Sequence, residues 1–379
     1  MTILSHEFEV VVVKRVQNAS AGTPPTFTEL GRIQPDGGSS GGTGLGYGLE
    51  LWGDDYISVA CDPTSLKSSI ADCLVDIKNN PIELHLYRDG TCIVAGPVIA
   101  WQVEGWTLVL TARGMLYYTR YMTLYEDLSF TSEDIGQVAV DLVDSHQDSK
   151  AYGHFGLDTS STDVATGKTI SRDYYQTDLV NIYEELMALG NQAGGYHLTV
   201  DYDTRDLELW SFLNPSPGYG TDKRDTVIFD QRAVRIVNMS VSLAAGEFGS
   251  AVASAGSGYV LSGGEEIDTS LRSTFGLAIV RHRVLNGINN ATDLQSVAQG
   301  RLNEVITGIL NPNREYDAVS GLEPVDDFAQ GDIVGFSYDA GFGEIQFAMQ
   351  VQAVHVSVKP GGLERINLEV DYELPFVAV

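Results

Sequence analysis

One stretch decides the fold, Ile82 to Thr111, and it reads IELHLYRDGTCIVAGPVIAWQVEGWTLVLT. Apolar and polar residues alternate from Ile82, the pair Asp89-Gly90 interrupts the alternation, and an apolar run resumes at Cys92. Asp-Gly between two alternating segments is a strong signal for a β-hairpin. The same scheme repeats around Glu104-Gly105. This region is therefore predicted to form a β-meander or a small barrel.

Strand patterns also open and close the chain. The β-branched run Phe8–Val16 predicts the first strand, and a second apolar stretch, Tyr47–Trp52, lies beyond a glycine-rich segment from Pro35 to Gly46 that we expect to be a surface loop. Alternation returns at Val234–Leu243. The last three predicted strands are Asp332–Tyr338, Ile345–Val358 and Leu363–Tyr372.

The middle of the chain changes to a helical period. Ile135, Val138, Ala139 and Leu142 recur every three or four residues behind the possible N-caps Thr131 and Ser132, which predicts an amphipathic helix. A second helix is predicted from Thr177 to near Gly194-Gly195, followed by a hairpin of Tyr196–Val200 and Leu207–Phe212. A third is predicted from the capping box Thr292–Gln295 to Ile306.

These elements predict a β-rich α+β fold with three regions. Residues 1–125 form an N-terminal β-barrel domain, residues 126–225 a helix-containing α+β insert, and residues 226–379 a C-terminal β-barrel region with one long helix. A chain of 379 residues is long enough for several cores, since domains usually hold about 100–200 residues.

The composition limits the classes of function that are expected. The 51 acidic and 23 basic residues give a formal charge of −28, and such a field repels phosphate backbones, so specific nucleic-acid binding is not expected. The three cysteines, Cys61, Cys73 and Cys92, are too few for a disulfide framework. No segment has the length of a membrane span and no secretory signal opens the chain, so we expect no membrane anchor.

Two motifs imitate catalytic or nucleotide-binding loops without their context. Gly37-Gly38-Ser39-Ser40-Gly41 satisfies the pattern of a nucleophile elbow, but its flanks are glycine-rich and no helix follows. Thr166-Gly167-Lys168-Thr169 resembles the end of a phosphate-binding loop, although Thr162 replaces the leading glycine. Neither predicts a site.

The sequence signals for a metal site are equally weak. Asp201, Asp203 and Asp206 are spaced like part of a calcium loop, yet Arg205 stands where an oxygen ligand is wanted, and a polar hairpin turn is the simpler interpretation. His146 and His154 are neighbours without a zinc-like spacing. We therefore predict no catalytic, cofactor-binding or metal site, no cofactor and no enzymatic activity.

Three passages resemble the minor tail proteins of long-tailed phages of actinobacteria, which are similar to the hub proteins of phage baseplates. They are the strands and aromatic residues of Ile82–Tyr121, the helical insert that ends in Gly194-Gly195-Tyr196 and its hairpin to Trp210, and the final part from Asp293 through Gln330-Gly331-Asp332-Ile333-Val334. Together they cover most of the chain.

The resemblance implies a structural protein of the virion, with two barrels side by side and three copies in a ring that matches a sixfold tail tube. Such a homotrimeric hub would lie at the tail tip after assembly in the host cytoplasm. It would cap the tube, anchor other tip proteins and let DNA pass.

Two other functions stay open. A tail-associated hydrolase of the cell envelope would need acidic side chains that converge in a cleft. A receptor- or carbohydrate-binding module would need exposed aromatic residues on one face, drawn from Trp52, Trp101, Trp106 and Trp210. Alternation in their strands predicts that Trp101 and Trp106 are core residues.

Overall fold

The structure is a computed structural model that describes most residues of the chain. Strands near the start of the chain and strands near its end belong to one large sheet. The described residues are 6–35, 44–51, 55–76, 81–192, 195–211, 220–230, 236–243, 251–256, 265–267, 280–285, 310–317, 322, 324–339, 344–359 and 363–372. The side chains of residues 236–317 are not among them.

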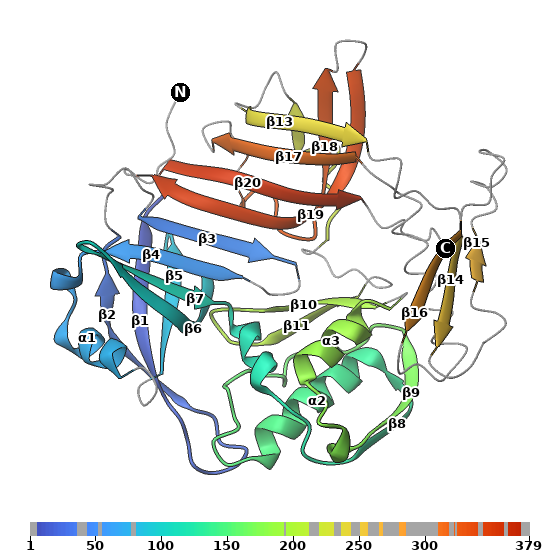
Figure 1. The fold of residues 1–379 in the computed structure, drawn as a ribbon, viewed down its shortest axis with the longest axis horizontal. Helices are drawn as coiled ribbons and strands as arrows, with labels where there is room; N and C mark the ends of the chain where they lie inside the picture. Colours follow the sequence, from blue (N-terminus) through green and yellow to red (C-terminus); the bar gives the residue numbers. More distant parts are fainter. Residues whose placement is uncertain are drawn as a thin grey trace.

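Seven strands from the first third of the chain form one half of a 13-stranded sheet, in the order β2-β1-β5-β6-β7-β4-β3 (Figure 1). All their ladders are antiparallel. The strands are β1 Phe8–Val16, β2 Thr26–Ile33, β3 Leu45–Glu50, β4 Tyr56–Cys61, β5 Ile82–Arg88, β6 Thr91–Glu104 and β7 Thr107–Arg113. The short helix α1, Ser68–Val75, lies between β4 and β5 in the chain.

The other half of the sheet comes from the end of the chain. Its strands are β12 Ile228–Asp230, β13 Ile236–Leu243, β17 Leu310–Asp317, β18 Ile333–Asp339, β19 Glu344–Lys359 and β20 Leu363–Tyr372. β3 pairs with β19, so that Tyr47 lies opposite Val356, and this ladder joins the two halves. A single apolar core contains side chains from both halves.

The β-rich α+β class predicted from the sequence is confirmed. Among the described strands, however, no ladder closes either half into a barrel, because β3 pairs with β19 and thus carries one half directly into the other. The predicted pair of separate barrels is therefore a continuous sheet in the described residues. The boundaries at residues 125 and 225 stay a prediction.

The predicted insert has its own core below this sheet in Figure 1. Two helices pack with two small antiparallel sheets, β8-β9 and β10-β11. The elements of the insert are β8 Leu128–Asp134, α2 Ile135–Ser149, β9 Thr169–Tyr174, η3 Gln176–Asp178, α3 Ile182–Gly190, β10 Tyr196–Val200 and β11 Leu207–Ser211. The 3₁₀ helix η2, Met115–Tyr121, precedes the predicted boundary at residue 125 and packs against the same core. The predicted hairpin around Asp203–Asp206 is confirmed, with Tyr196 opposite Ser211.

Two predicted helix starts were wrong. Thr131 and Ser132 lie in β8, and the N-cap of α2 is Asp134, whose carboxylate accepts the amide of Gly136. The second helix begins at Ile182 rather than at Thr177, because Leu179 has a φ of 49° and ends a short 3₁₀ turn. The third predicted helix, Thr292–Ile306, lies outside the described residues.

A separate three-stranded sheet appears at the right of Figure 1. It contains β14 Ala251–Gly256, β15 Glu265–Ile267 and β16 Val280–Leu285, and β14 is parallel to β16.

A buried ion pair joins the sheet to the insert. Both oxygens of the fully buried Glu83 on β5 accept from the guanidinium of Arg205, at 2.9 and 3.0 Å. His85 Nε2 lies 3.0 Å from the same carboxylate, and the hydroxyl of Tyr118 donates to it at 2.7 Å. Burial by itself would raise the pKa of Glu83, but the hydrogen bond from His85 and the charge of Arg205 together hold it well below its usual range.

A second buried ion pair joins the same strand to the C-terminal half. Arg88 Nε on β5 lies 3.2 Å from Oε1 of Glu364 on β20, and both side chains are buried. The hydroxyl of Tyr47 on β3 donates to the same oxygen at 2.9 Å. Asp326 adds an ion pair to Arg88 at 2.8 Å. β5 thus carries an anion near its start and a cation at its end, and each contacts a different part of the chain.

We predict that Glu83→Gln lowers the free energy of unfolding at pH 7 by about 3 kcal/mol, because Arg205 then keeps a half-paired charge away from water. Urea denaturation measures the change. Glu7→Gln, at an exposed glutamate, is the control and should leave the midpoint unchanged. Equal midpoints for the two variants would show that the buried pair does not hold the insert.

We also predict how the stability of the Glu83→Gln variant depends on pH. Because the folded-state pKa of Glu83 lies below its unfolded value of about 4.3, its contribution to stability is present above that pH and is lost as the pH falls further. Burial lowers the pKa of His197 to about 3 in the folded state. His197 therefore also reduces the stability as the pH falls below its pKa in the unfolded chain, about 6.5. Compared with the wild type, the Glu83→Gln variant should therefore lose less stability in acid only below about pH 4.3. Identical acid profiles of variant and wild type would contradict this.

Candidate functional site

The nucleophile-elbow pattern cannot be placed, because Ser39 and its neighbours lie outside the described residues. The structure does place the loop that imitates a phosphate-binding motif. The Asp134 carboxylate accepts the amides of Thr166 and Gly167 at 3.2 and 3.0 Å and the hydroxyl of Thr166 at 2.6 Å. It also caps α2. The backbone donors that would bind a phosphate are thus already bound to a carboxylate of the same chain.

The aspartates of the hairpin turn also form local contacts. Asp201 Oδ1 accepts the amides of Asp203 and Thr204 at 2.8 and 3.0 Å, the arrangement of an Asx turn. Arg205 points away from them to Glu83. In the part of the chain that the structure describes, no three His, Cys, Asp or Glu side chains are grouped to hold a metal ion.

The two neighbouring histidines have separate surroundings. His146 Nδ1 lies 2.9 Å from the carbonyl of Thr123, and its ring stacks on Phe155 with centroids 5.7 Å apart. His154 Nδ1 accepts the amide of Gly156 at 3.0 Å. Burial lowers the pKa of both imidazoles. Both therefore contribute as neutral packing and hydrogen-bonding groups near pH 7.

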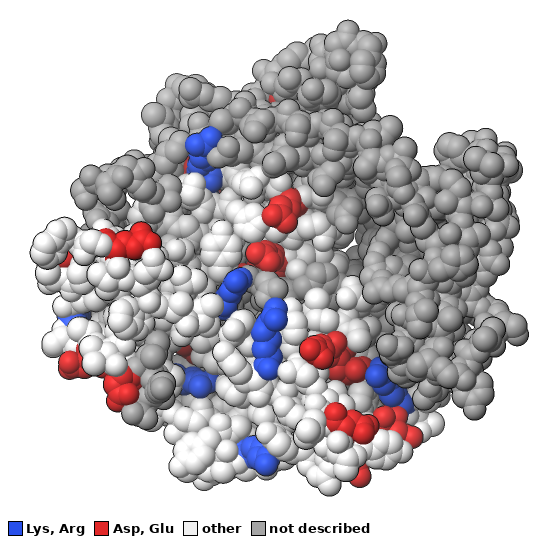
Figure 2. Space-filling view, viewed as in Figure 1, with Lys and Arg blue, Asp and Glu red and all other residues white. Residues whose placement is uncertain are grey.

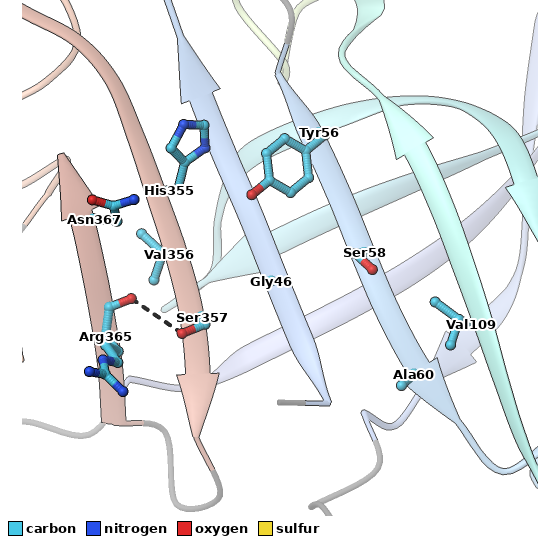
Figure 3. Close-up of a pocket in the computed structure, with 10 residues that line it drawn as sticks. All are labelled: Gly46, Tyr56, Ser58, Ala60, Val109, His355, Val356, Ser357, Arg365 and Asn367. Carbon is cyan, nitrogen blue, oxygen red and sulfur yellow. Dashed lines mark hydrogen bonds between the residues drawn. The ribbon is translucent and has the colours of Figure 1, made fainter. Parts of the chain in front are cut away.

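A shallow groove of about 380 Å³ crosses the outer face of the sheet where its halves meet (Figure 3). Residues of β3, β4, β7, β19 and β20 line it, and its polar side chains are Tyr56, Ser58, His355, Ser357, Arg365 and Asn367. The ring of His355 stacks on Tyr56 at 5.8 Å. Sequence reasoning missed this groove because its walls come from segments about 300 residues apart in the chain.

The groove does not hold a nucleophile with its base. The Ser357 hydroxyl bonds the carbonyl of Arg365, as the dashed line in Figure 3 marks, and His355 Nε2 lies 3.2 Å from Glu369. Burial, together with the charge of Glu50, raises the pKa of Tyr56, so the phenol stays protonated near pH 7. What the lining offers is a polar contact surface at the junction of the two halves.

Two tryptophans that were predicted to be core residues are exposed. Trp101 is 47% exposed and Trp106 is 89% exposed, both at the end of the β6-β7 hairpin. Alternation identifies the face on which a side chain lies, but it does not reveal where the covering layer ends. Trp210 is half-buried, and Trp52 lies outside the described residues.

Acidic and basic side chains are interspersed on the face of the described residues shown in Figure 2. Several acidic side chains gather toward the lower right, over the insert. No helix in the described part of the chain is long and apolar enough to cross a membrane.

Comparisons with known proteins identify the fold. No protein-family model and no curated protein matches the chain. Among solved structures, the chain is similar to the 43 kDa tail protein of prophage MuSo2 from Shewanella oneidensis, with a TM-score of 0.60 and 12% identity over 97% of both chains. It is also similar to prophage tail protein gp18 from Listeria monocytogenes EGD-e, with a TM-score of 0.58 and 11% identity over 96% of this chain and 95% of that one.

A third similar structure is the tail protein from Neisseria meningitidis MC58, with a TM-score of 0.57 and 11% identity over 98% of this chain and 97% of that one. The chain therefore has the fold of phage tail proteins along nearly its whole length.

We predict that Asp134→Ala destabilises the chain by about 2 kcal/mol, because it removes the cap of α2 and leaves several loop donors without their acceptor. Chemical denaturation measures the change. Asp163→Ala removes one amide acceptor from the same loop and is the control, with a smaller expected loss. If both variants lost the same stability, Asp134 would not be the residue that orders this loop.

Proposed function

We propose that the chain is a non-enzymatic structural protein of a phage tail, located in the virion at the tail tip. Three copies form a hub that caps the tail tube, anchors other tip proteins and lets DNA pass. The observation that carries this proposal is the similarity of the whole fold to tail proteins over 95% or more of each chain. The sequence resemblance to minor tail proteins of actinobacteriophages supports the same role and suggests the host group.

The arrangement of the sheet supports a ring-forming subunit. The two halves joined by β3 and β19 would present two similar β-rich units per chain, and three chains would present six to a sixfold tube. The buried ion pairs of Glu83 and Arg88 fix the two halves and the insert relative to one another. A subunit at a symmetry mismatch needs such a fixed geometry, because both of its halves must fit neighbours at once.

The acidic charge suits this position. If copies of the chain form a ring around a DNA channel, an inner wall with few cations would not displace counterions from the passing DNA. Such a wall would therefore not bind the phosphates of the DNA. The 23 basic residues against 51 acidic ones make that wall possible.

A tail-associated hydrolase is the weaker proposal. Four of the acidic side chains that are buried in the described residues lie in ion pairs: Glu83 with Arg205, Glu185 with Arg172, Asp332 with Lys223 and Glu364 with Arg88. The fifth, Asp55, accepts a hydrogen bond from the hydroxyl of Tyr202. A carboxylate engaged in a buried ion pair is poorly placed to act as a general acid or base.

We predict that the isolated chain is monomeric or weakly associated and becomes trimeric only on the tail, since copies that each carry −28 repel at low salt. Light scattering of the purified chain at low and high salt measures the first part, and the copy number in purified particles measures the second. A stable hexamer in solution, or one copy per particle, would contradict the hub.

A further inference from the structure

The β6-β7 hairpin extends beyond the core of the sheet. β5 pairs with β6 only up to Pro97, and the rest of β6 has β7 as its one described neighbour. The strand changes neighbours just after Gly96, where a Cβ atom would lie 2.0 Å from the carbonyl oxygen of Arg113. A side chain cannot fit there, so glycine permits the close approach that redirects β6.

From Ile99 onward the apolar side chains of β6 are exposed. Ile99, Trp101 and Val103 are 39%, 47% and 53% exposed. Trp101 lies opposite the buried Leu110, and Val103 opposite the buried Leu108. Residues directly opposite in a ladder share a face, so Trp101 and Val103 lie on the core side of the sheet. They continue the core face of the sheet past the place where β5 stops pairing with β6.

The turn of the hairpin adds a larger apolar group. Gly105 has a φ of 63° and precedes Trp106, which is 89% exposed. A two-residue turn with glycine first is typical of a tight hairpin. The tight turn therefore holds the indole of Trp106 in solvent without a strained or flexible loop.

The backbone of residues 99–104 is also open on one side. Among the described residues, no strand pairs with the outer edge of this part of β6. Proteins usually protect such an edge with lysine, proline or a covering segment, because it can pair with a strand of another chain. Here the edge bears alternating apolar residues instead.

The charge near the hairpin indicates which partner fits. Asp62 follows Cys61, which lies opposite Leu108, so Asp62 and Glu104 lie at the same end of the sheet as the turn. Both carboxylates are exposed. A second copy of this chain carries −28 and few cations, and an anionic membrane would likewise be repelled. A basic protein surface is the complementary one.

We propose that the edge of residues 99–104 receives an extended strand from a different protein of the tail, one with alternating apolar residues and lysine or arginine opposite Glu104. The added strand covers Trp101 and Val103, and Trp106 enters an apolar pocket of the same partner. This inference rests on the proposed function and names the surface and the chemistry of one partner.

The size of the patch explains why it anchors an assembly rather than a dimer. With each indole offering roughly 150–250 Å², the exposed fractions of 47% and 89% leave about 200–340 Å² for the two tryptophans together. A stable interface needs about 800 Å² per partner. The hairpin alone therefore should not dimerise the chain in solution, and the remaining area comes from the paired strand and its surroundings.

The test is photo-crosslinking in assembled particles. A benzoyl-phenylalanine residue replaces Trp106, the particles are irradiated, and mass spectrometry identifies the joined peptides. We expect joined peptides from one other tail protein, within an alternating segment that contains lysine or arginine. Joined peptides from a second copy of this chain, or none at all, would overturn the proposal while leaving the structural role intact. Absence of the chain from the particles would overturn both.

A double variant gives a second measurement. Trp101→Ala with Trp106→Ala should reduce the amount of the chain in particles by about tenfold or more, as expected for the loss of buried tryptophan anchors. Tyr175→Ala, at an exposed aromatic residue of the insert, is the matched control and should be incorporated normally. Circular dichroism checks that both variants fold. Normal incorporation of the double variant would refute the proposal, as would binding of the isolated wild type to anionic vesicles that the variant loses.

Discussion

The structure depends on the two opposite charges buried along β5. Ile82, Leu84 and Leu86 belong to the core of the sheet, so Glu83 alternates away from that core toward the insert. Arg88, five residues later, points with the even-numbered residues and meets Glu364 of the C-terminal half. One strand therefore orients three parts of the chain. Neither charge can be buried without its partner, so each part must dock in one position.

This constraint accounts for the continuity of the sheet. Tyr47 of β3 donates to the same Glu364 that pairs with Arg88, next to the ladder in which β3 and β19 meet. Hydrogen bonding and charge pairing thus close the junction from inside the core, while the shallow groove lies on its outer face.

The similarity of this fold to those of phage tail proteins at 11–12% identity has a physical explanation. A β-sheet is specified by alternation and by its turns, and many apolar residues satisfy the same pattern. The surface can then change freely. In this chain the sequence carries a net charge of −28, and the one conspicuous apolar feature of the described hairpins is the exposed end of β6 and β7.

By itself the sequence determined the local elements of this protein. Alternation and the Asp89-Gly90 and Glu104-Gly105 turns predicted β5, β6 and β7, and the apolar residues three or four apart from Ile135 predicted α2, because these patterns act over a few residues. Only the tertiary structure decided that Arg205, in a turn that resembles a calcium loop, binds Glu83, and that Asp134 fills the loop at Thr166. It also decided that Trp101 lies past the end of the β5–β6 pairing, where its side chain is exposed. Those outcomes depend on contacts between distant segments, for which the spacing of residues in the chain carries no signal.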